Sequence, residues 1–174
     1  TAQFIISKFT PDLLIPVEGV GDFDVTFTNS SSSARTFDFI DVLPYNGDAR
    51  IPPSDFDGSI SLSNVDYSRS PSISSTYITY ENPSTINSDP NSNVAAGTGI
   101  WSCTLAQVDT SGCPTSAQVT ALRFVTSSLP AGTRETVRIT IGTLNNSGEN
   151  YYTNNAMGRA SGLAGEIHTE DVYF

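Results

Sequence analysis

The sequence has very little positive charge. Lysine and arginine together number 8 among 174 residues, against 18 aspartates and glutamates, which gives a formal net charge of −10 and a pI near 4.2. Lys8 is the only lysine, and the other basic residues are all arginine. So acidic a chain argues against binding to nucleic acid or to an anionic membrane surface, because phosphate groups attract basic side chains. We therefore expect no nucleic-acid partner and no membrane insertion.

Long hydrophobic runs are also missing. A transmembrane helix needs about 20 consecutive apolar residues, and the longest apolar stretches of this sequence are far shorter. The sequence shows no signal peptide, anchor or purification tag. We expect a mature chain or an excised domain.

Cysteine and histidine are scarce. Two cysteines and one histidine cannot complete a four-ligand zinc site without carboxylates, so we expect no metal and no cofactor. Cys103 and Cys113 enclose turn residues, which predicts a disulfide that closes a hairpin; a pair of free thiols is the alternative. A disulfide indicates an oxidising compartment, and we expect an extracellular protein.

Helix signals are weak throughout, and no long segment has an apolar period of 3.6 residues. Alternating apolar residues separated by turn residues recur instead. They predict strands at 2–8, 22–28, 36–43, 59–63, 76–80, 99–105, 119–125, 135–142, 151–160 and 166–174. This series is typical of an antiparallel β-sandwich, which we expect as one domain over 1–174 with insertions after Asp48 and after Glu81.

Strand parity places three polar side chains on otherwise apolar faces: Lys8, Asp41 and Asn154. An unpaired buried ammonium is costly, so Lys8 needs a partner, a route to solvent or a reactive role. Three unrelated positions are the plain alternative, namely an edge-strand lysine, an acid that caps the turn before Pro44 and a hydrogen-bonded core asparagine. A register slip of one residue would also turn each side chain to the opposite face.

If the three side chains meet, they can react with one another. In an apolar pocket, burial favours the neutral forms of an amine and of a carboxylic acid. The neutral Lys8 amine is then a nucleophile toward the carboxamide of Asn154, while Asp41 polarises that group and transfers protons. Ammonia leaves and an isopeptide bond joins the first strand to a late one.

Several motifs follow Lys8 in a fixed order: "GVGDFDVTFTN" at 19–29, "FIDVLP" at 39–44, "WSC" at 101–103, "LPAGT" at 129–133 and "YTNNA" at 152–156. Together they resemble the repeated immunoglobulin-like domains of bacterial surface proteins related to the collagen-adhesin fold, over residues 6–174. The resemblance implies an all-β, antiparallel immunoglobulin-like β-sandwich with long loop insertions. In members that crosslink themselves, it implies the reacting groups Lys8, Asp41 and Asn154, with Asn155 as the alternative asparagine.

Other candidate sites carry weaker signals. His168 is the single histidine, but no G-x-S-x-G sequence accompanies it, and a lone histidine is more often structural. The segments 46–48 and 55–58 could supply oxygen ligands to calcium, although neither has EF-hand spacing and turn formation is the commoner use. Asn29 and Asn145 each begin a glycosylation sequon, a pattern that serine-rich turns produce by chance.

The leading hypothesis is a non-enzymatic structural module of a bacterial surface stalk, adhesin or filament, whose partners are neighbouring copies or adjacent domains of the same surface protein. Its isopeptide bond would lie within the domain or, if the first strand is donated to a neighbour, between subunits. The alternative is a ligand-binding adhesin tip domain, in which the insertions at 50–58 and 81–98 recognise a glycan or a host protein. A hydrolase is the third hypothesis and has the least support.

Overall fold

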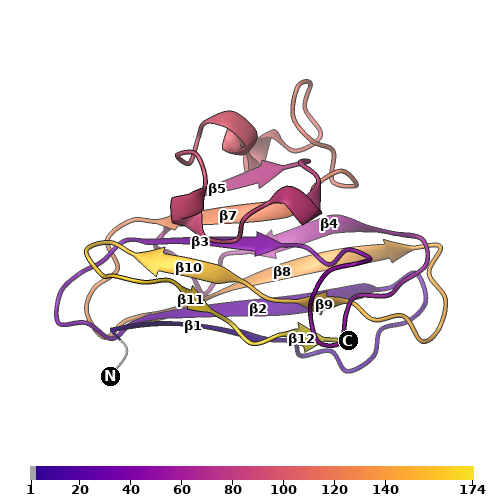
Figure 1. The fold of residues 1–174 in the computed structure, drawn as a ribbon, viewed down its shortest axis with the longest axis horizontal. Helices are drawn as coiled ribbons and strands as arrows, with labels where there is room; N and C mark the ends of the chain where they lie inside the picture. The colour runs from indigo at the N-terminus through magenta and orange to yellow at the C-terminus, as the bar shows by residue number, and fades with distance from the viewer. Residues whose placement is uncertain (1–2) are drawn as a thin grey trace.

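The structure, a computed structural model, describes residues 3–174 as two main β-sheets packed face to face, with a third sheet of only two strands (Figure 1). Ala2, where the first predicted strand begins, lies outside the described residues. The strands are β1 (Phe4–Phe9), β2 (Val20–Asn29), β3 (Phe37–Val42), β4 (Ser59–Asp66), β5 (Ile73–Thr79), β6 (Cys103–Thr104), β7 (Ala121–Thr126), β8 (Arg134–Leu144), β9 (Thr153–Asn154), β10 (Met157–Ala160), β11 (Ile167–His168) and β12 (Val172–Tyr173).

The strand order is that of an immunoglobulin-like sandwich. One sheet has the order β1-β2-β8-β4 and the other the order β11-β10-β3-β7-β5-β6, and the neighbouring strands pair antiparallel. The first order corresponds to strands A, B, E and D of an immunoglobulin domain, and β11, β10 and β3 correspond to G, F and C. β5, β6 and β7 extend the second sheet beyond strand C. The prediction of an all-β, antiparallel immunoglobulin-like sandwich is confirmed.

The main hydrophobic core lies between the two sheets. On β1, Phe4 and Ile6 are buried while Ile5 and Phe9 are exposed, which is the alternation expected of a strand with one face on the core. The same alternation runs along β2 and β8, whose inward aromatic and branched side chains contact one another. β3 is buried on both faces, because Ile40 and Val42 on its outer face belong to a second buried cluster. Each buried side chain of this size stabilises the fold by about 1.5–3 kcal/mol.

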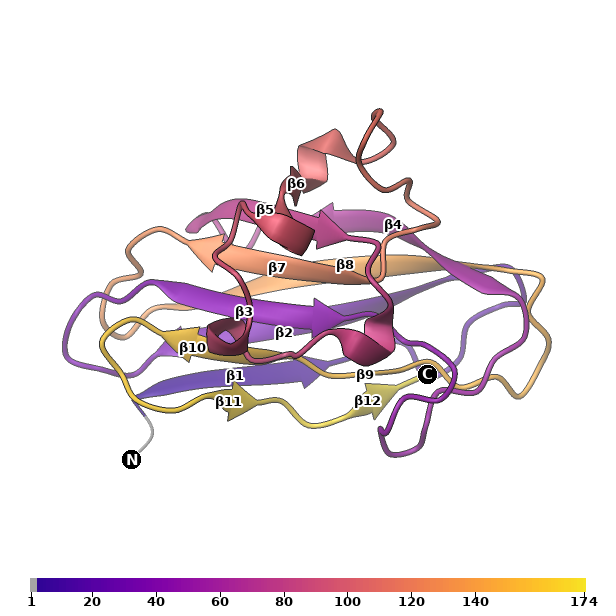
Figure 2. The same ribbon diagram turned by 45° about the horizontal axis from the view of Figure 1, so that its top comes forward.

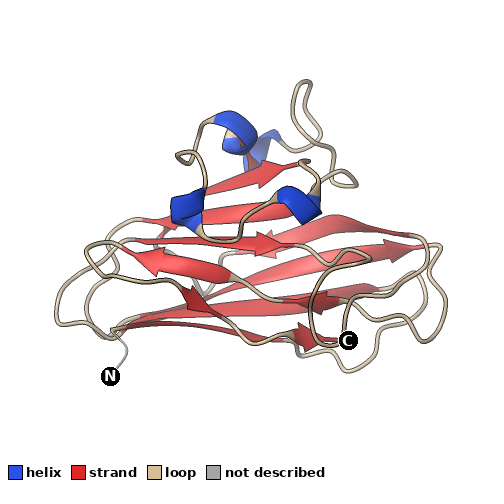
Figure 3. Ribbon diagram, viewed as in Figure 1, coloured by secondary structure: helices blue, strands red, loops and turns tan. Residues whose placement is uncertain are grey.

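The segment after β5 forms a cap on the outer face of the second sheet. It contains the short 3₁₀ helices η1 (Pro83–Thr85), η2 (Pro90–Ser92), η3 (Gly99–Trp101) and η4 (Leu105–Gln107), which Figure 3 draws in blue and Figure 2 shows spread over the second sheet from β5 to β3. Trp101 is fully buried beneath it against Ile40, Val42 and Ala121. Within residues 3–174, no helix is long and apolar enough to cross a membrane.

The strand predicted at 99–105 is therefore wrong. Only Cys103–Thr104 pairs, with β5, and the residues before it form η3. The apolar residues of this segment suggested a strand, but Trp101 is buried on the outside of the sandwich, where its indole Nε1–H donates to Asn93 Oδ1 at 3.0 Å. The tight turn of η3 puts the ring there.

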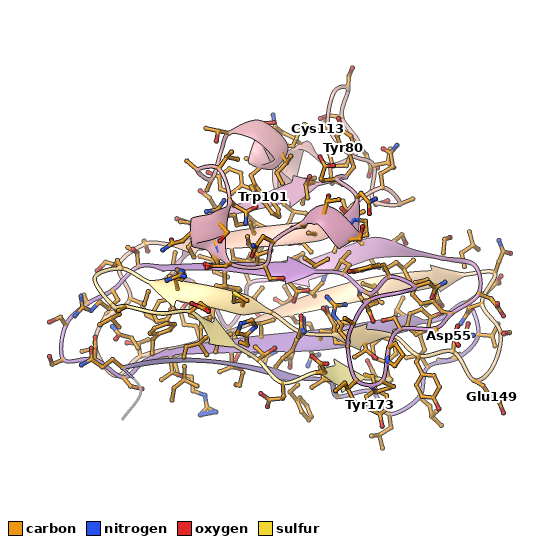
Figure 4. The ribbon with its side chains drawn as sticks, in the orientation of Figure 1. Asp55, Tyr80, Trp101, Cys113, Glu149 and Tyr173 are labelled. Carbon is orange, nitrogen blue, oxygen red and sulfur yellow. A yellow bond between two sulfur atoms is a disulfide. The ribbon has the colours of Figure 1, made fainter. Side chains whose placement is uncertain are left out.

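The disulfide between Cys103 and Cys113 is confirmed, with a Cα–Cα distance of 5.8 Å. The hairpin that it was predicted to close is wrong, because η4 and two turns occupy the enclosed segment. Figure 4 shows Cys113 and Trp101 in the cap, away from the end of the sandwich that carries Glu149 and Tyr173. The disulfide thus ties together the cap.

The two late strands are each split in two. The strand predicted at 151–160 forms β9 and β10, and the one predicted at 166–174 forms β11 and β12. Between the halves, the Thr169 hydroxyl accepts a hydrogen bond from the Ala156 N–H at 2.9 Å, where a regular ladder would use a backbone carbonyl. The break in the first of the two strands thus falls just after Asn154.

Candidate functional site

Lys8, Asp41 and Asn154 meet in the core between the two sheets. β1 brings Lys8 from the first sheet, β3 brings Asp41 from the second, and β9 brings Asn154. Lys8 is 3% exposed, and the other two residues are 0% exposed. The inward orientation that strand parity predicted is thus found on all three strands.

The carboxyl group of Asp41 bridges the amine and the carboxamide. Lys8 Nζ donates a hydrogen bond to Asp41 Oδ2, and Asn154 Nδ2 donates to Asp41 Oδ1 at 2.8 Å. The two carboxyl oxygens therefore contact the two nitrogens that a crosslinking reaction would exchange. This arrangement suits transfer of a proton from one nitrogen to the other.

Asn155 contributes through its backbone. Its N–H donates to Asn154 Oδ1 at 2.8 Å, and its carbonyl accepts from Lys8 Nζ at 3.2 Å. Its side chain turns aside, because Asn155 Nδ2 donates to Asp171 Oδ1 at 2.8 Å. The alternative asparagine is thus placed beside the site while its carboxamide binds elsewhere.

Aromatic side chains form an apolar wall of the site. Lys8 Nζ lies 5.1 Å from the centroid of the Phe23 ring, within the range of a cation–π contact. The Phe23 ring stacks on that of Phe174 at 4.9 Å, and Phe174 packs against Tyr152 at 5.6 Å. These rings separate the site from solvent on one side.

Burial lowers the pKa of Lys8 from 10.5 to about 8, because the ammonium has lost its water. The charge and hydrogen bond of Asp41 act in the opposite direction and raise the pKa, while the charge of Arg50 lowers it further. At neutral pH a pKa of about 8 leaves roughly a tenth of the amine uncharged. The site therefore holds a lysine with appreciable nucleophilic character.

Sequence reasoning missed three contributors to this site. Phe23 lies on a face predicted to be inward, but nothing in the pattern placed it over Lys8. Phe174 belongs to a segment predicted as a simple terminal strand. Arg50 lies in the stretch at 50–58, which was predicted to be a loop insertion, yet it is only 8% exposed. Burial of a loop arginine leaves no periodic signal in a sequence.

The remaining candidates do not form a site. The side chain of His168 is exposed on β11. Across residues 3–174, no group of three or more His, Cys, Asp or Glu side chains is arranged to hold a metal ion. Asp48 instead pairs with Arg50, and Asp57 accepts a hydrogen bond from Ser147. The sequon asparagine Asn29 is fully buried, and its amide donates to two backbone carbonyls.

The insertions pack onto the sandwich. The stretch at 81–98 belongs to the cap, where Asp89 forms an ion pair with Arg159 at 2.6 Å. In the stretch at 50–58, Ser54 Oγ accepts from the Thr153 N–H at 3.0 Å, and Phe56 stacks on Tyr152 at 4.7 Å. Figure 4 shows Asp55 at the same end of the molecule as Glu149 and Tyr173.

Comparisons with known proteins returned solved structures. No protein-family model matches the chain, and no curated protein matches it. The major pilin SpaD from Corynebacterium diphtheriae aligns with 98% of this chain and 35% of its own, at 10% identity and a TM-score of 0.48. The C-terminal domain of the AgI/II polypeptide BspA from Streptococcus agalactiae aligns over 97% of this chain and 49% of its own, at 10% identity and a TM-score of 0.46.

A third similar structure is the collagen-binding domain of a Staphylococcus aureus adhesin. It aligns over 100% of this chain and 96% of its own length, at 10% identity and a TM-score of 0.41. The chain thus spans between a third and a half of the first two proteins and nearly the full length of the third.

Proposed function

We propose that the chain is a non-enzymatic structural module of a bacterial surface stalk, adhesin or filament, held together by an autocatalytic isopeptide bond between Lys8 and Asn154. The observation that carries this proposal is the buried contact of one amine, one carboxylic acid and one carboxamide from three strands. The sequence motifs, which resemble bacterial surface domains, support the cellular setting. The disulfide supports an extracellular location, because disulfides persist in oxidising compartments.

The reaction uses only atoms that are present at the site. The uncharged Lys8 Nζ attacks Cγ of Asn154, and the N–H of Asn155 stabilises the negative charge that develops on Asn154 Oδ1. Asp41 takes a proton from Nζ at Oδ2 and supplies one to Nδ2 at Oδ1. The Cγ–Nδ2 bond breaks, ammonia leaves, and a Cγ–Nζ amide bond remains. Both side chains are consumed, so there is no turnover.

The bond would secure an otherwise weakly held strand. β1 is at the edge of its sheet and pairs only with β2 among the described strands. A covalent link from β1 to β9 prevents a pulling force from peeling β1 away. It also closes a loop of well over 100 residues, which in the chain-entropy account raises the free energy of unfolding by about 5 kcal/mol.

The structure favours a bond within one chain over a bond between subunits. β1 forms a full ladder with its own β2, from Phe4 opposite Asn29 to Phe9 opposite Asp24. All three proposed reacting side chains then lie in one molecule.

The intact mass of the unfolded, reduced chain tests the proposal. We expect a mass one ammonia below that of the reduced chain, restored to the full value by Lys8→Ala and by Asp41→Asn, which keeps the shape of the acid but cannot accept the proton. Arg134→Ala, a change at an exposed position, serves as the control and should keep the deficit. A wild-type chain with its full mass would contradict the proposal, and multimers that survive boiling would place the bond between subunits.

A further inference from the structure

Arg50 is a buried cation in a connection between strands. It lies between β3 and β4, yet its guanidinium side chain is only 7% exposed. Its NH2 group donates to the Val42 carbonyl at 2.6 Å, and its NH1 group donates to the Thr153 carbonyl at 2.8 Å. Asp48, which is also buried, accepts from NH1 at 3.2 Å. The guanidinium is thus held by two backbone carbonyls and one carboxylate.

The two carbonyls belong to the neighbours of the proposed reacting residues. Val42 directly follows Asp41, and Thr153 directly precedes Asn154. The ladder between β3 and β10 ends with Ile40 opposite Met157, so it does not reach either reacting residue. β9 itself pairs with β12. Arg50 therefore joins the backbones that carry the acid and the carboxamide at a point where strand pairing does not.

Arg50 also acts on the amine through its charge. A guanidinium stays protonated at every accessible pH, so its field is permanent. The charged groups that act on Lys8 are Asp41 on β3, Arg50 and Asp171, and of these only Arg50 disfavours the ammonium. Asp171 accepts from the Ile51 N–H at 2.8 Å and thereby fixes the residue next to Arg50.

We propose that Arg50 is a positioning residue for the crosslinking reaction, which holds Asp41 and Asn154 in register and favours the uncharged Lys8 amine. This inference rests on the proposed function. A guanidinium can perform both tasks because its planar fork donates to two carbonyls at once while it carries a charge. Lysine at this position would keep the charge but lose the fork, and glutamine would keep a donor but lose the charge.

The test follows the reaction in time. The chains are isolated unfolded in denaturant, and their mass is measured to show that the isopeptide bond has not formed. They are then refolded at a series of pH values between 6 and 9, and the loss of ammonia is followed over time by mass spectrometry. For the wild type we expect a rate that rises with pH, has its midpoint near pH 8 and levels off above it. For Arg50→Gln we expect a rate roughly ten- to a hundredfold lower and a midpoint at higher pH. For Arg50→Lys we expect a reduced rate with a nearly unchanged midpoint.

Arg123 provides a matched control. It is 3% exposed, pairs with Asp38 and donates to the Val94 carbonyl at 2.7 Å, but it lies under the cap on the outer face. Arg123→Gln therefore removes a similar set of buried contacts away from Lys8. We expect it to leave both the rate per folded molecule and the pH midpoint at their wild-type values, with folding followed by the fluorescence of Trp101.

The outcomes separate the two proposals. A wild-type chain that never loses ammonia overturns both the proposed function and this inference. A wild-type chain that crosslinks, beside an Arg50→Gln chain with the same rate and midpoint, overturns the role of Arg50 alone. Equal slowing by Arg50→Gln and Arg123→Gln also overturns it, because the effect is then general destabilisation. If Arg50→Gln does not fold, a wild-type rate in Arg50→Lys overturns the positioning role.

Discussion

When the chain folds, the ammonium of Lys8 loses its bound water and instead contacts the Asp41 carboxylate, the Asn155 carbonyl and the Phe23 ring. Such an exchange is unfavourable for a permanent charge, because the desolvation of a buried ion pair commonly outweighs its mutual attraction. Reaction would remove this cost, since the product amide carries no charge. The same residues would therefore destabilise the fold before the reaction and stabilise it afterwards.

This cost predicts a pH dependence in a chain that cannot react. In Asn154→Ala, Lys8 stays a free amine with a folded-state pKa of about 8, below the 10.5 of the unfolded chain. Between these values the unfolded state binds more protons, so the free energy of unfolding rises with pH across this window. At about 1.4 kcal/mol per pKa unit, the rise amounts to roughly 3 kcal/mol.

Urea titrations at pH 7.5, 9 and 10 measure the effect. Lys8→Met combined with Asn154→Ala is the control, since every other titratable group is the same in both chains. A slope that is equal in the two chains would contradict the assignment of the pH dependence to Lys8.

At the scale of elements, a glycine sets how closely β1 approaches β10. A Cβ added at Gly158 would lie 2.2 Å from Ile6 Cδ1 and 2.7 Å from Phe39 Cβ. Both neighbours are buried and belong to the core. The absence of a side chain on β10 therefore lets the two sheets close at the strand that carries Lys8.

Gly158→Ala should accordingly destabilise the fold by about 1–3 kcal/mol, the range for overpacking of a well-packed core. Urea unfolding in a Lys8→Ala background gives the value without interference from a crosslink. Gly148→Ala is the matched control, because no atom lies within 4 Å of a Cβ built there. Equal midpoints for the two variants would show that the core adapts to the methyl group.

The regular strands could be predicted from the sequence, and the breaks within the late strands could not. Alternation places Lys8 and Asp41 correctly because β1 and β3 are continuous strands, although both faces of β3 are buried. Asn154 lies on a strand of only two residues, and although parity predicted its inward position, the neighbouring break at Thr169 follows no period. Trp101 was assigned to a strand because burial outside the sandwich has the same apolar signature as burial within it.

The site could be predicted in part for the same reason. All three reacting side chains follow from strand parity, and the family resemblance implies the same three. The ring of Phe174 and the guanidinium of Arg50 reach the site from segments without repeating patterns. Their positions depend on tertiary contacts, which the local sequence does not encode.

For the whole molecule, the disulfide and the proposed isopeptide bond would stabilise different parts. The disulfide lies in the cap, within a short stretch of sequence. The isopeptide bond would join the two sheets of the sandwich. Reduction should therefore loosen the cap and leave the link between β1 and β9 intact.

The distance along the chain between Lys8 and Asn154 has one more consequence. The proposed bond between their side chains would convert almost the entire polypeptide into a closed ring with two short tails. A ring that is cut once becomes linear without losing any part. Trypsin cleavage after Arg69, whose side chain is 51% exposed between β4 and β5, should thus leave a single covalent species on a reducing, denaturing gel, whereas the same cut in Asn154→Ala should release two fragments.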